Sequence, residues 1–353
     1  MRILVTGAAG FIGTRLSAAL LSRGLTDSSG RPAAIRELTL ADRSPPVCSD
    51  PRARCIALDV ADPSALESAL REGFDSVFAL AATLTVDAET NFAHGLDVNL
   101  RGLLALLEAC RRSGKAPRLV FASSLAAFGG PLPETVDDHL QLTPQTSYGT
   151  QKAIGELLVN DYSRHGFIDG RSLRLPIVMV RSSAARGDGS GTGSGPRAAQ
   201  PAAPTVSGAI AALVADRLAG RDVTCPLAPD TRIAAVSVDR VVDALIAIHD
   251  APASAFGHTR SMNLPALSLT LAELAEATDR AALRLGVRSG AVDWAPEPRF
   301  QTAVDQWPRR FVSQAAERLG IRSDASADEI VDGYIGQTPG LAKAVAAATE
   351  VPR

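Results

Sequence analysis

The sequence is poor in the residues that build metal sites and disulfide bonds. Its four cysteines form no Cys-x-x-Cys pair, and its five histidines are scattered without the spacing at which a helix presents zinc ligands. We therefore expect reduced thiols, a cytoplasmic protein and no bound metal. No apolar run approaches the length of a membrane span, and the chain opens into a strand-like segment, so we expect neither a membrane span nor a signal peptide.

The sequence also lacks a surplus of charge of either sign. The formal net charge is −2 over 353 residues, which predicts no basic surface and no nucleic-acid partner. Hydrophobic residues make up 46% of the chain, enough to bury a large core. The length suits one large domain or two of unequal size. A small molecule is the partner that this composition leaves open.

Tyrosine and lysine are scarce as well: the chain has three of each, yet Tyr148 and Lys152 lie four residues apart. Apolar residues follow them at helical spacing, and Ser147 can cap such a helix. Residues i and i+4 share one helical face, so a phenol and an ammonium would stand side by side. A nearby cation lowers the pKa of a phenol, which could then exchange a proton with an alcohol or a carbonyl. Alone, the pattern also fits a buried tyrosine and a surface lysine without function.

Short apolar runs alternate with helical patterns through the first half of the chain. Near-continuous apolar strands separated by helices are typical of a parallel sheet covered on both faces. The sequence therefore predicts a doubly wound α/β domain. Its expected strands span 2–6, 37–42, 54–60, 75–82, 118–124 and 171–180, with a long helix over 88–113.

Three glycines, Gly7, Gly10 and Gly13, lie directly between the first predicted strand and the first helix. Glycine permits the tight turn, the close approach of a pyrophosphate and the packing of the helix on the strand. The helix N-terminus then offers backbone N–H groups to the phosphates. This arrangement predicts a dinucleotide-binding loop.

Two carboxylates at strand ends extend this prediction. Asp42 ends the second strand, where a carboxylate binds the ribose hydroxyls of adenosine and repels a 2′-phosphate, so we expect NAD rather than NADP. The polar stretch 26–34 explains the long spacing between the glycines and Asp42 as a loop. Asp59 ends the third strand and either meets the adenine or caps the helix that follows.

Two further polar residues lie where an active site would form. Ser124 ends the fifth strand, at the carboxyl edge of the sheet. Asn99 interrupts the apolar face of the long helix. A buried amide needs partners, which either a water chain beneath Lys152 or a helix-to-strand hydrogen bond would supply.

Together these motifs resemble the extended short-chain dehydrogenase/reductases, which are NAD-dependent epimerases, dehydratases and dehydrogenases with a Rossmann domain. The likeness implies that Tyr148 is the catalytic acid/base, that Lys152 lowers its pKa and binds the nicotinamide ribose, and that Ser124 holds the substrate oxygen. It also implies a cofactor site that includes Phe11, Ile12, Val60, Leu80, Ala81, Ala82, Asn99, Pro176, Ile177 and Val178.

The likeness divides the chain into parts. We expect residues 1–181 to form the NAD-binding Rossmann domain, with parts of 226–250 returning to it. Residues 182–204 are rich in glycine, serine, alanine and proline and predict a flexible insertion. Residues 205–340 should form mainly a smaller α+β lobe that binds the substrate. The resemblance leaves a homodimer open.

Local patterns give this lobe its elements. Thr270 and Glu273 have the spacing of a capping box at the start of a helix. The expected helices cover about 205–220, 238–250, 270–285 and 309–319, and the expected strands cover 231–238, 261–265 and 291–295.

The residues that the sequence lacks narrow the class of substrate. The segment after the sixth strand lacks the asparagine usual in nucleotide-sugar epimerases, and Leu125 and Ala126 stand where sugar dehydratases carry acidic residues. Four stretches resemble the group that oxidises the sugar acid D-erythronate at its 2-hydroxyl to a 2-oxo-tetronate: 123–133, 143–164, 226–232 and 262–270. An epimerase with the same Ser-Tyr-Lys residues and a non-catalytic NAD-binding module remain as alternatives.

A sugar acid carries a carboxylate that the site must neutralise. An arginine suits this role because its planar fork meets both carboxylate oxygens. We expect the substrate to contact Thr83, Ser124, Tyr148 and either Arg232 or Arg181. Arg232 is the first choice, and the alternative for it is a surface ion pair with Asp230 or Asp239.

Overall fold

The computed structural model describes residues 1–27, 29–179, 205–338 and 340–341 of the chain. The predicted insertion at 182–204 lies outside the described residues, as does Arg181. The chain forms two compact units. The first contains Met1–Pro176, Asp239–Ala266 and Arg310–Ser323, and the second contains Ile177–Val238, Leu267–Arg309 and Asp324–Arg353.

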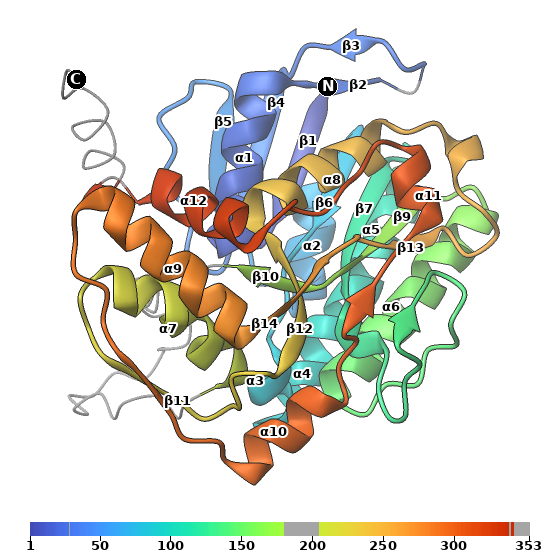
Figure 1. The fold of residues 1–353 in the computed structure, drawn as a ribbon. Helices are drawn as coiled ribbons and strands as arrows, with labels where there is room; N and C mark the ends of the chain where they lie inside the picture. Colours follow the sequence, from blue (N-terminus) through green and yellow to red (C-terminus); the bar gives the residue numbers. More distant parts are fainter. Residues whose placement is uncertain (28, 180–204, 339, 342–353) are drawn as a thin grey trace, which may run out of the picture. The chain divides into compact units, whose positions relative to one another are not determined.

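A seven-stranded sheet forms the centre of the first unit (Figure 1). The strands lie in the order β13-β9-β7-β6-β1-β4-β5, and all neighbouring pairs are parallel. The direction of winding reverses between β1 and β6, so the carboxyl ends of these two strands flank the crevice where such sheets bind ligands. The predicted doubly wound α/β sheet is thus confirmed. Its strands are β1 (Arg2–Thr6), β4 (Glu37–Asp42), β5 (Ala53–Ala57), β6 (Ser76–Ala79), β7 (Arg118–Ser124), β9 (Asp169–Leu175) and β13 (Ser261–Asn263).

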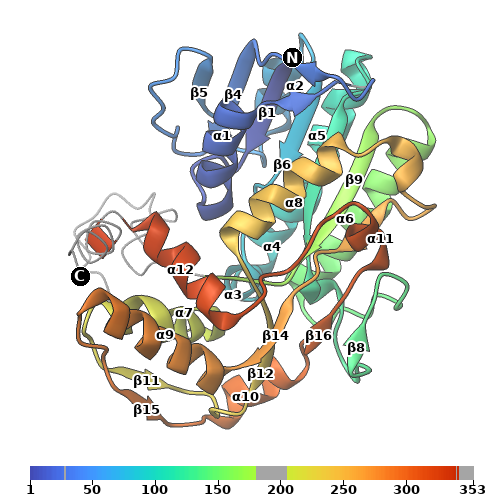
Figure 2. The same ribbon diagram turned by 45° about the horizontal axis from the view of Figure 1, so that its top comes forward.

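Helices cover both faces of this sheet. On one face, α2 (Pro63–Leu70), α5 (Gly102–Ser113) and α6 (Ser147–Arg164) contribute apolar side chains to one buried cluster with the strands. On the other face lie α1 (Phe11–Arg23) and α8 (Val238–Asp250), and Figure 2 shows α8 running across the strands. The smaller elements of this unit are the hairpin β2 (Leu25–Thr26) and β3 (Pro32–Ala33), the pair β8 (Thr135–Val136) and β16 (Arg310–Phe311), and α11 (Gln314–Arg318).

The prediction of one long helix over 88–113 is wrong. This stretch contains α3 (Thr85–Thr90), α4 (Phe92–Leu96), a π-helical turn (Asp97–Arg101) and α5. Asn91 separates α3 from α4 with a non-helical backbone, and its side chain accepts a hydrogen bond from the His94 N–H. An asparagine side chain competes with helical hydrogen bonding in this way, which the apolar spacing alone did not reveal.

Two strand predictions are also corrected. The strand expected over 171–180 is divided, because Pro176 has no N–H to donate to a continuous ladder. β9 ends before this proline, and β10 (Ile177–Met179) pairs with a strand of the second unit. The strand expected over 261–265 in the small lobe is instead β13, which pairs with β9 in the large sheet.

The second unit combines small sheets with helices. The strands β10, β12 and β14 form one sheet, and β11 pairs with β15. The predicted capping box is present, since Thr270 and Glu273 each accept a hydrogen bond from the backbone of the other at the start of α9. The remaining elements are β11 (Val223–Cys225), β12 (Arg232–Ser237), β14 (Leu267–Thr270), β15 (Val292–Trp294), α7 (Val206–Leu218), α9 (Leu271–Leu285), α10 (Pro298–Asp305) and α12 (Ala327–Gln337).

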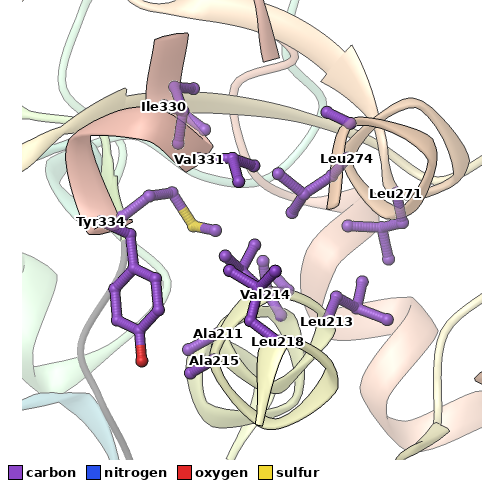
Figure 3. Close-up of a cluster of buried hydrophobic side chains, with 14 of the residues drawn as sticks. Ala211, Leu213, Val214, Ala215, Leu218, Leu271, Leu274, Ile330, Val331 and Tyr334 are labelled. Atoms are coloured by element: carbon purple, nitrogen blue, oxygen red, sulfur yellow. The ribbon is translucent and has the colours of Figure 1, made fainter. Parts of the chain in front are cut away.

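A separate hydrophobic core holds the second unit together. The helices α7, α9 and α12 each contribute buried side chains to it, among them Val214, Leu274 and Val331 (Figure 3). Removing such apolar area from water stabilises a fold by about 25 cal/mol per Å². The unit therefore has its own source of stability, independent of the large sheet.

The side chain of His249, near the end of α8, is buried in the first unit. His249 has no exposed surface, and its ring stacks on Phe78 with 5.4 Å between the ring centroids. One ring nitrogen lies 2.8 Å from the Ser76 hydroxyl and the other lies 2.8 Å from the Asp250 carboxylate. Burial lowers the pKa of His249, and the hydrogen bond with Asp250 opposes this effect. Because Ser76 and His249 are both fully buried, this Ser-His-Asp arrangement cannot meet a substrate.

We expect the free energy of unfolding to fall as the pH drops from about 7.5 to about 5.5. An unfolded histidine takes up a proton with a pKa of about 6.5. Folded His249 resists protonation because burial lowers its pKa, and the charges of Arg118 and Arg171 lower it further. Chemical denaturation at several pH values should show a weaker pH dependence in the Ser76→Ala/His249→Phe double variant, which makes both partners apolar. An equal dependence in the two proteins would assign the effect to other groups.

Candidate active site

The glycine loop has no room for side chains at two of its three glycines. Gly7 has a φ of +73°, and a Cβ atom there would lie 2.7 Å from the backbone nitrogen of Ala81. A Cβ atom at Gly13 would lie 2.1 Å from the carbonyl oxygen of Gly7. Gly10 is the N-cap of α1, and its N–H bonds to Gly7 in the turn. These residues fit a dinucleotide, because the backbone alone lines the approach to the helix N-terminus.

Asp42 lies beside this loop at the end of β4. Its carboxylate accepts hydrogen bonds from the backbone N–H of Ala9, at 3.0 Å, and of Arg43, at 2.8 Å. This places the carboxylate at the rim of the predicted cofactor site, as an interaction with ribose hydroxyls requires. The polar stretch before it contains the β2–β3 hairpin, which accounts for the long spacing from the glycines.

Asp59 follows β5 and is exposed. Its carboxylate accepts a hydrogen bond from the backbone N–H of Ala61. The cap of α2 is Asp62, which accepts hydrogen bonds from the N–H groups of Ser64 and Ala65. The alternative that Asp59 caps this helix is therefore wrong, and its predicted contact with the adenine stays a prediction.

The start of α6 brings Tyr148 to Ser124. Thr146, and not Ser147 as predicted, caps the helix by accepting a hydrogen bond from the Gly149 N–H. A Cβ atom at Gly149 would lie 1.9 Å from the carbonyl oxygen of Ala126, so the first turn of α6 touches the turn that follows Ser124. Tyr148 and Ser124 are joined by a side-chain hydrogen bond. The structure thus places a phenol and a hydroxyl together at the carboxyl end of β7.

Lys152 lies one helical turn further on and is buried. Its Nζ donates a hydrogen bond to the Ala122 carbonyl at 2.7 Å and lies 5.6 Å from the centroid of the Tyr148 ring. Burial lowers the pKa of Lys152 to about 7, and the charge of Glu156 partly offsets this. The protonation of Lys152 therefore depends on the balance between its burial and the charge of Glu156.

The expected lowering of the phenol pKa is not found in this structure. Tyr148 keeps part of its surface exposed, yet dense packing raises its pKa to about 12, and the hydrogen bond with Ser124 lowers it only in part. Desolvation therefore outweighs neighbouring groups, because it favours the neutral form of both Tyr148 and Lys152.

A buried ion pair supports this helix from behind. Glu156 lies one turn after Lys152 and pairs with Arg174, with 2.8 Å between Oε2 and Nη2. The Ser123 hydroxyl donates to the other carboxylate oxygen at 2.5 Å. Sequence reasoning missed Glu156, although its i+4 spacing from Lys152 was a usable signal.

Asn99 is buried within the π-helical turn and bonds to the backbone of Thr83. Its Oδ1 accepts from the Thr83 N–H at 2.9 Å, and its Nδ2 donates to the Thr83 carbonyl at 3.0 Å. Protein groups therefore satisfy this amide, as the alternative of a direct hydrogen bond from the helix to the sheet side predicted. A water chain beneath Lys152 stays untested.

The other predicted residues fall into three groups. Phe11 and Ile12 open α1, while Leu80 to Thr83 follow β6 and Val60 follows β5, all in the first unit. Ile177 and Val178 belong to β10 in the second unit, after Pro176 ends the first. Arg232 begins β12 in the second unit, is exposed, and donates to the Ser268 carbonyl at 3.3 Å. The described chain contains no ion pair between Arg232 and Asp230.

Two searches of the described residues found no further features. No group of three or more His, Cys, Asp or Glu side chains in that part of the chain could hold a metal ion. None of the helices described there combines the length and the apolar character needed to cross a bilayer.

The fold and the site together define a class of protein. The model of the NAD-dependent epimerase/dehydratase family matches residues 3–263, which include the glycine loop, Ser124, Tyr148 and Lys152. The chain belongs to this family, and it is an NAD-dependent enzyme.

Two curated relatives are similar over nearly their whole length. The chain is 40% identical to a D-erythronate dehydrogenase of Cupriavidus necator over 344 residues, covering 97% of this chain and 100% of the relative. It is 32% identical to a D-erythronate dehydrogenase of Haemophilus influenzae, covering 95% and 99%. Among solved structures, a nucleoside-diphosphate-sugar epimerase from Agrobacterium tumefaciens matches with a TM-score of 0.82 and 31% identity, covering 96% of this chain and 95% of that one.

Gly149→Ala should lower kcat by about 100-fold, because a misplacement of about 1 Å at a reacting group has effects of this size. The added Cβ atom must push α6 away from Ala126 and so separate Tyr148 from Ser124. Gly257→Ala is the matched control, since no atom lies within 4 Å of a Cβ atom at that position. Unchanged turnover in the Gly149 variant would contradict the proposed importance of this contact.

Proposed function

We propose that the protein oxidises a sugar acid at its 2-hydroxyl, with D-erythronate as the substrate and a 2-oxo-tetronate as the product. The observation that carries this proposal is the 40% identity with a D-erythronate dehydrogenase over the full length of that relative. The joined side chains of Tyr148 and Ser124 support it, because alcohol oxidation needs a base and a hydrogen-bond donor at one oxygen.

NAD, when bound, supplies the acceptor for the hydride that leaves the carbon of the 2-hydroxyl. Tyr148 accepts the hydroxyl proton as a phenolate, and Ser124 holds the same oxygen. Burial raises the pKa of the phenol to about 12, so the phenolate needs positive charge near it. Lys152 supplies that charge when protonated, and the Glu156 carboxylate favours its protonated form.

A nucleotide-sugar epimerase with the same three residues is the second candidate. The observation in its favour is the 31% identity with the Agrobacterium tumefaciens structure, which is described as such an epimerase. An epimerase regenerates its own NAD in each cycle, whereas a dehydrogenase accumulates NADH. The test is NADH absorbance, measured with D-erythronate and, in parallel, with UDP-sugars. An increase with D-erythronate identifies a dehydrogenase. Epimer formation without net NADH would overturn the first proposal.

Tyr148→Phe should abolish oxidation while leaving NADH binding nearly intact, because only the ionisable oxygen is removed. A lost general base lowers the rate by about 10²- to 10⁴-fold. The measurement is steady-state NADH formation together with NADH titration by fluorescence. Tyr334→Phe, at a buried tyrosine in the core of the second unit, is the control for the loss of a phenol oxygen elsewhere. A Tyr148 variant that kept more than a few per cent of activity would remove it from this role.

We further propose that Arg232 binds the substrate carboxylate, with Arg181 as the alternative. Arg232 is exposed, and its Nη1 donates a hydrogen bond to the Ser268 carbonyl. Within the described residues its charge is not paired with the carboxylate of Asp230. A planar fork of this kind can meet both oxygens of an acid.

Arg232→Ala should raise KM for D-erythronate at least tenfold, since truncating a charge-assisted contact can cost about 2–5 kcal/mol. Oxidation of an uncharged polyol should change far less. Arg299→Ala is a suitable control, because Arg299 is an exposed arginine of the same unit that pairs with Glu297. Equal losses on both substrates, or none on either, would shift the assignment to Arg181.

A further inference from the structure

Gln151 lies in α6 between Tyr148 and Lys152, and neither role above uses it. Its side chain is 3% exposed, which is unusual for a glutamine. Its Oε1 accepts a hydrogen bond from Nδ2 of Asn99 at 2.7 Å. Asn99 lies in the π-helical turn, so this bond joins the helix of the reacting phenol to a neighbouring segment.

Asn99 passes this connection on to the backbone of Thr83. The same amide that meets Gln151 donates to the Thr83 carbonyl and accepts from the Thr83 N–H. Thr83 follows Leu80, Ala81 and Ala82 after β6, beside the glycine loop that packs on Ala81. One side chain therefore fixes both polar groups of a residue at the crevice of the sheet.

The orientation of both amides follows from the backbone. The Thr83 N–H requires an acceptor, so it must face Oδ1 of Asn99, and the Thr83 carbonyl must face Nδ2. Nδ2 can then meet only the oxygen of Gln151, because two amide N–H₂ groups would repel one another. Nε2 of Gln151 has no hydrogen-bond partner within the described residues. The oxygen of Gln151 is thus the end of the side chain that makes a specific contact.

The surroundings leave little freedom for this arrangement. A Cβ atom at Gly95 of α4 would lie 2.9 Å from Ala88 of α3 and 3.3 Å from Nε2 of Gln151. At the far end of α3, the Glu89 carboxylate accepts a hydrogen bond from the Ser147 N–H at 2.5 Å. The segment from Thr83 to Glu89 is therefore tied to α6 at both ends. π-helical turns of this kind are frequent at functional sites.

We propose that Gln151 is a positioning residue, which holds the segment after β6 in register with the catalytic helix through Asn99. In this arrangement, Thr83 and the cofactor-lining residues before it keep a fixed distance from the phenol of Tyr148. The proposal rests on the proposed function only in taking α6 as the catalytic helix. It does not depend on which alcohol is oxidised.

Two variants of Gln151 distinguish the effect of its acceptor oxygen from the effect of its side-chain size. Gln151→Met keeps the length and removes the acceptor, so the Nδ2 group of Asn99 loses a partner. Gln151→Glu keeps an oxygen towards Asn99 in either protonation state. Its second oxygen replaces an N–H₂ group that has no partner within the described residues. Ser163→Ala is the matched control, because Ser163 lies at the other end of α6 and binds the Gly170 N–H.

Amide hydrogen exchange is the first readout, and it needs neither cofactor nor substrate. Exchange of the Thr83 N–H should become about tenfold faster in Gln151→Met, as expected for a weakening of about 1.4 kcal/mol. It should remain close to the original rate in Gln151→Glu and in Ser163→Ala. The second readout is turnover under saturating NAD, where kcat should fall roughly ten- to a hundredfold in the Met variant alone.

The outcomes are decisive in both directions. Faster Thr83 exchange with lower kcat in Gln151→Met, and recovery of both in Gln151→Glu, support the proposal. Original exchange and kcat in the Met variant, or equal losses in the Glu variant and the Ser163 control, overturn it. A failure of D-erythronate as substrate leaves the exchange result intact, so the proposed function and this inference fail separately.

Discussion

The contact between two stretches of backbone, at Gly149 and Ala126, is the constraint on which the site depends. A hydrogen atom is the only side chain that fits between them, since a Cβ atom at Gly149 would lie 1.9 Å from the Ala126 carbonyl oxygen. This approach seats the first turn of α6 on the turn after β7. Tyr148 and Ser124, one on each side of the contact, are joined as a result. Backbone packing, and not side-chain type alone, therefore brings Tyr148 and Ser124 together.

The enclosure that creates the site also works against its charges. Burial raises the pKa of Tyr148 to about 12 and lowers that of Lys152 to about 7, so each group is pushed towards its neutral form. The buried ion pair of Glu156 and Arg174 opposes this effect at Lys152, because the Glu156 carboxylate favours the charged form of the lysine. Burying an ion pair is costly, and here its carboxylate also favours the protonated form of Lys152 on the same helix. Under the proposed function, the positive charge of bound NAD adds to that of Lys152, so cofactor binding would favour the phenolate of Tyr148.

Much of the site could be predicted from the sequence because parallel strands share one carboxyl edge. Placing Asp42 and Ser124 at strand ends was enough to locate them, and the glycine spacing located the loop. Failures arose where tertiary contacts override local pattern. Asn91 interrupts a helix that its apolar spacing favours, and Pro176 sends one apolar run into two different sheets. Gln151 gave no signal, since only the folded chain shows that Asn99 is its partner.

The position of β13 bears on how the chain is made. This strand covers the outer edge of β9, yet it comes from residues 261–263, and α8 covers one sheet face from residues 238–250. A nascent chain that has left the ribosome only as far as Pro176 has all the other strands of the sheet but an unpaired edge on β9. Unpaired edges invite association with other chains. The dinucleotide-binding half therefore cannot complete its fold during early translation, although the glycine loop is the first motif synthesised.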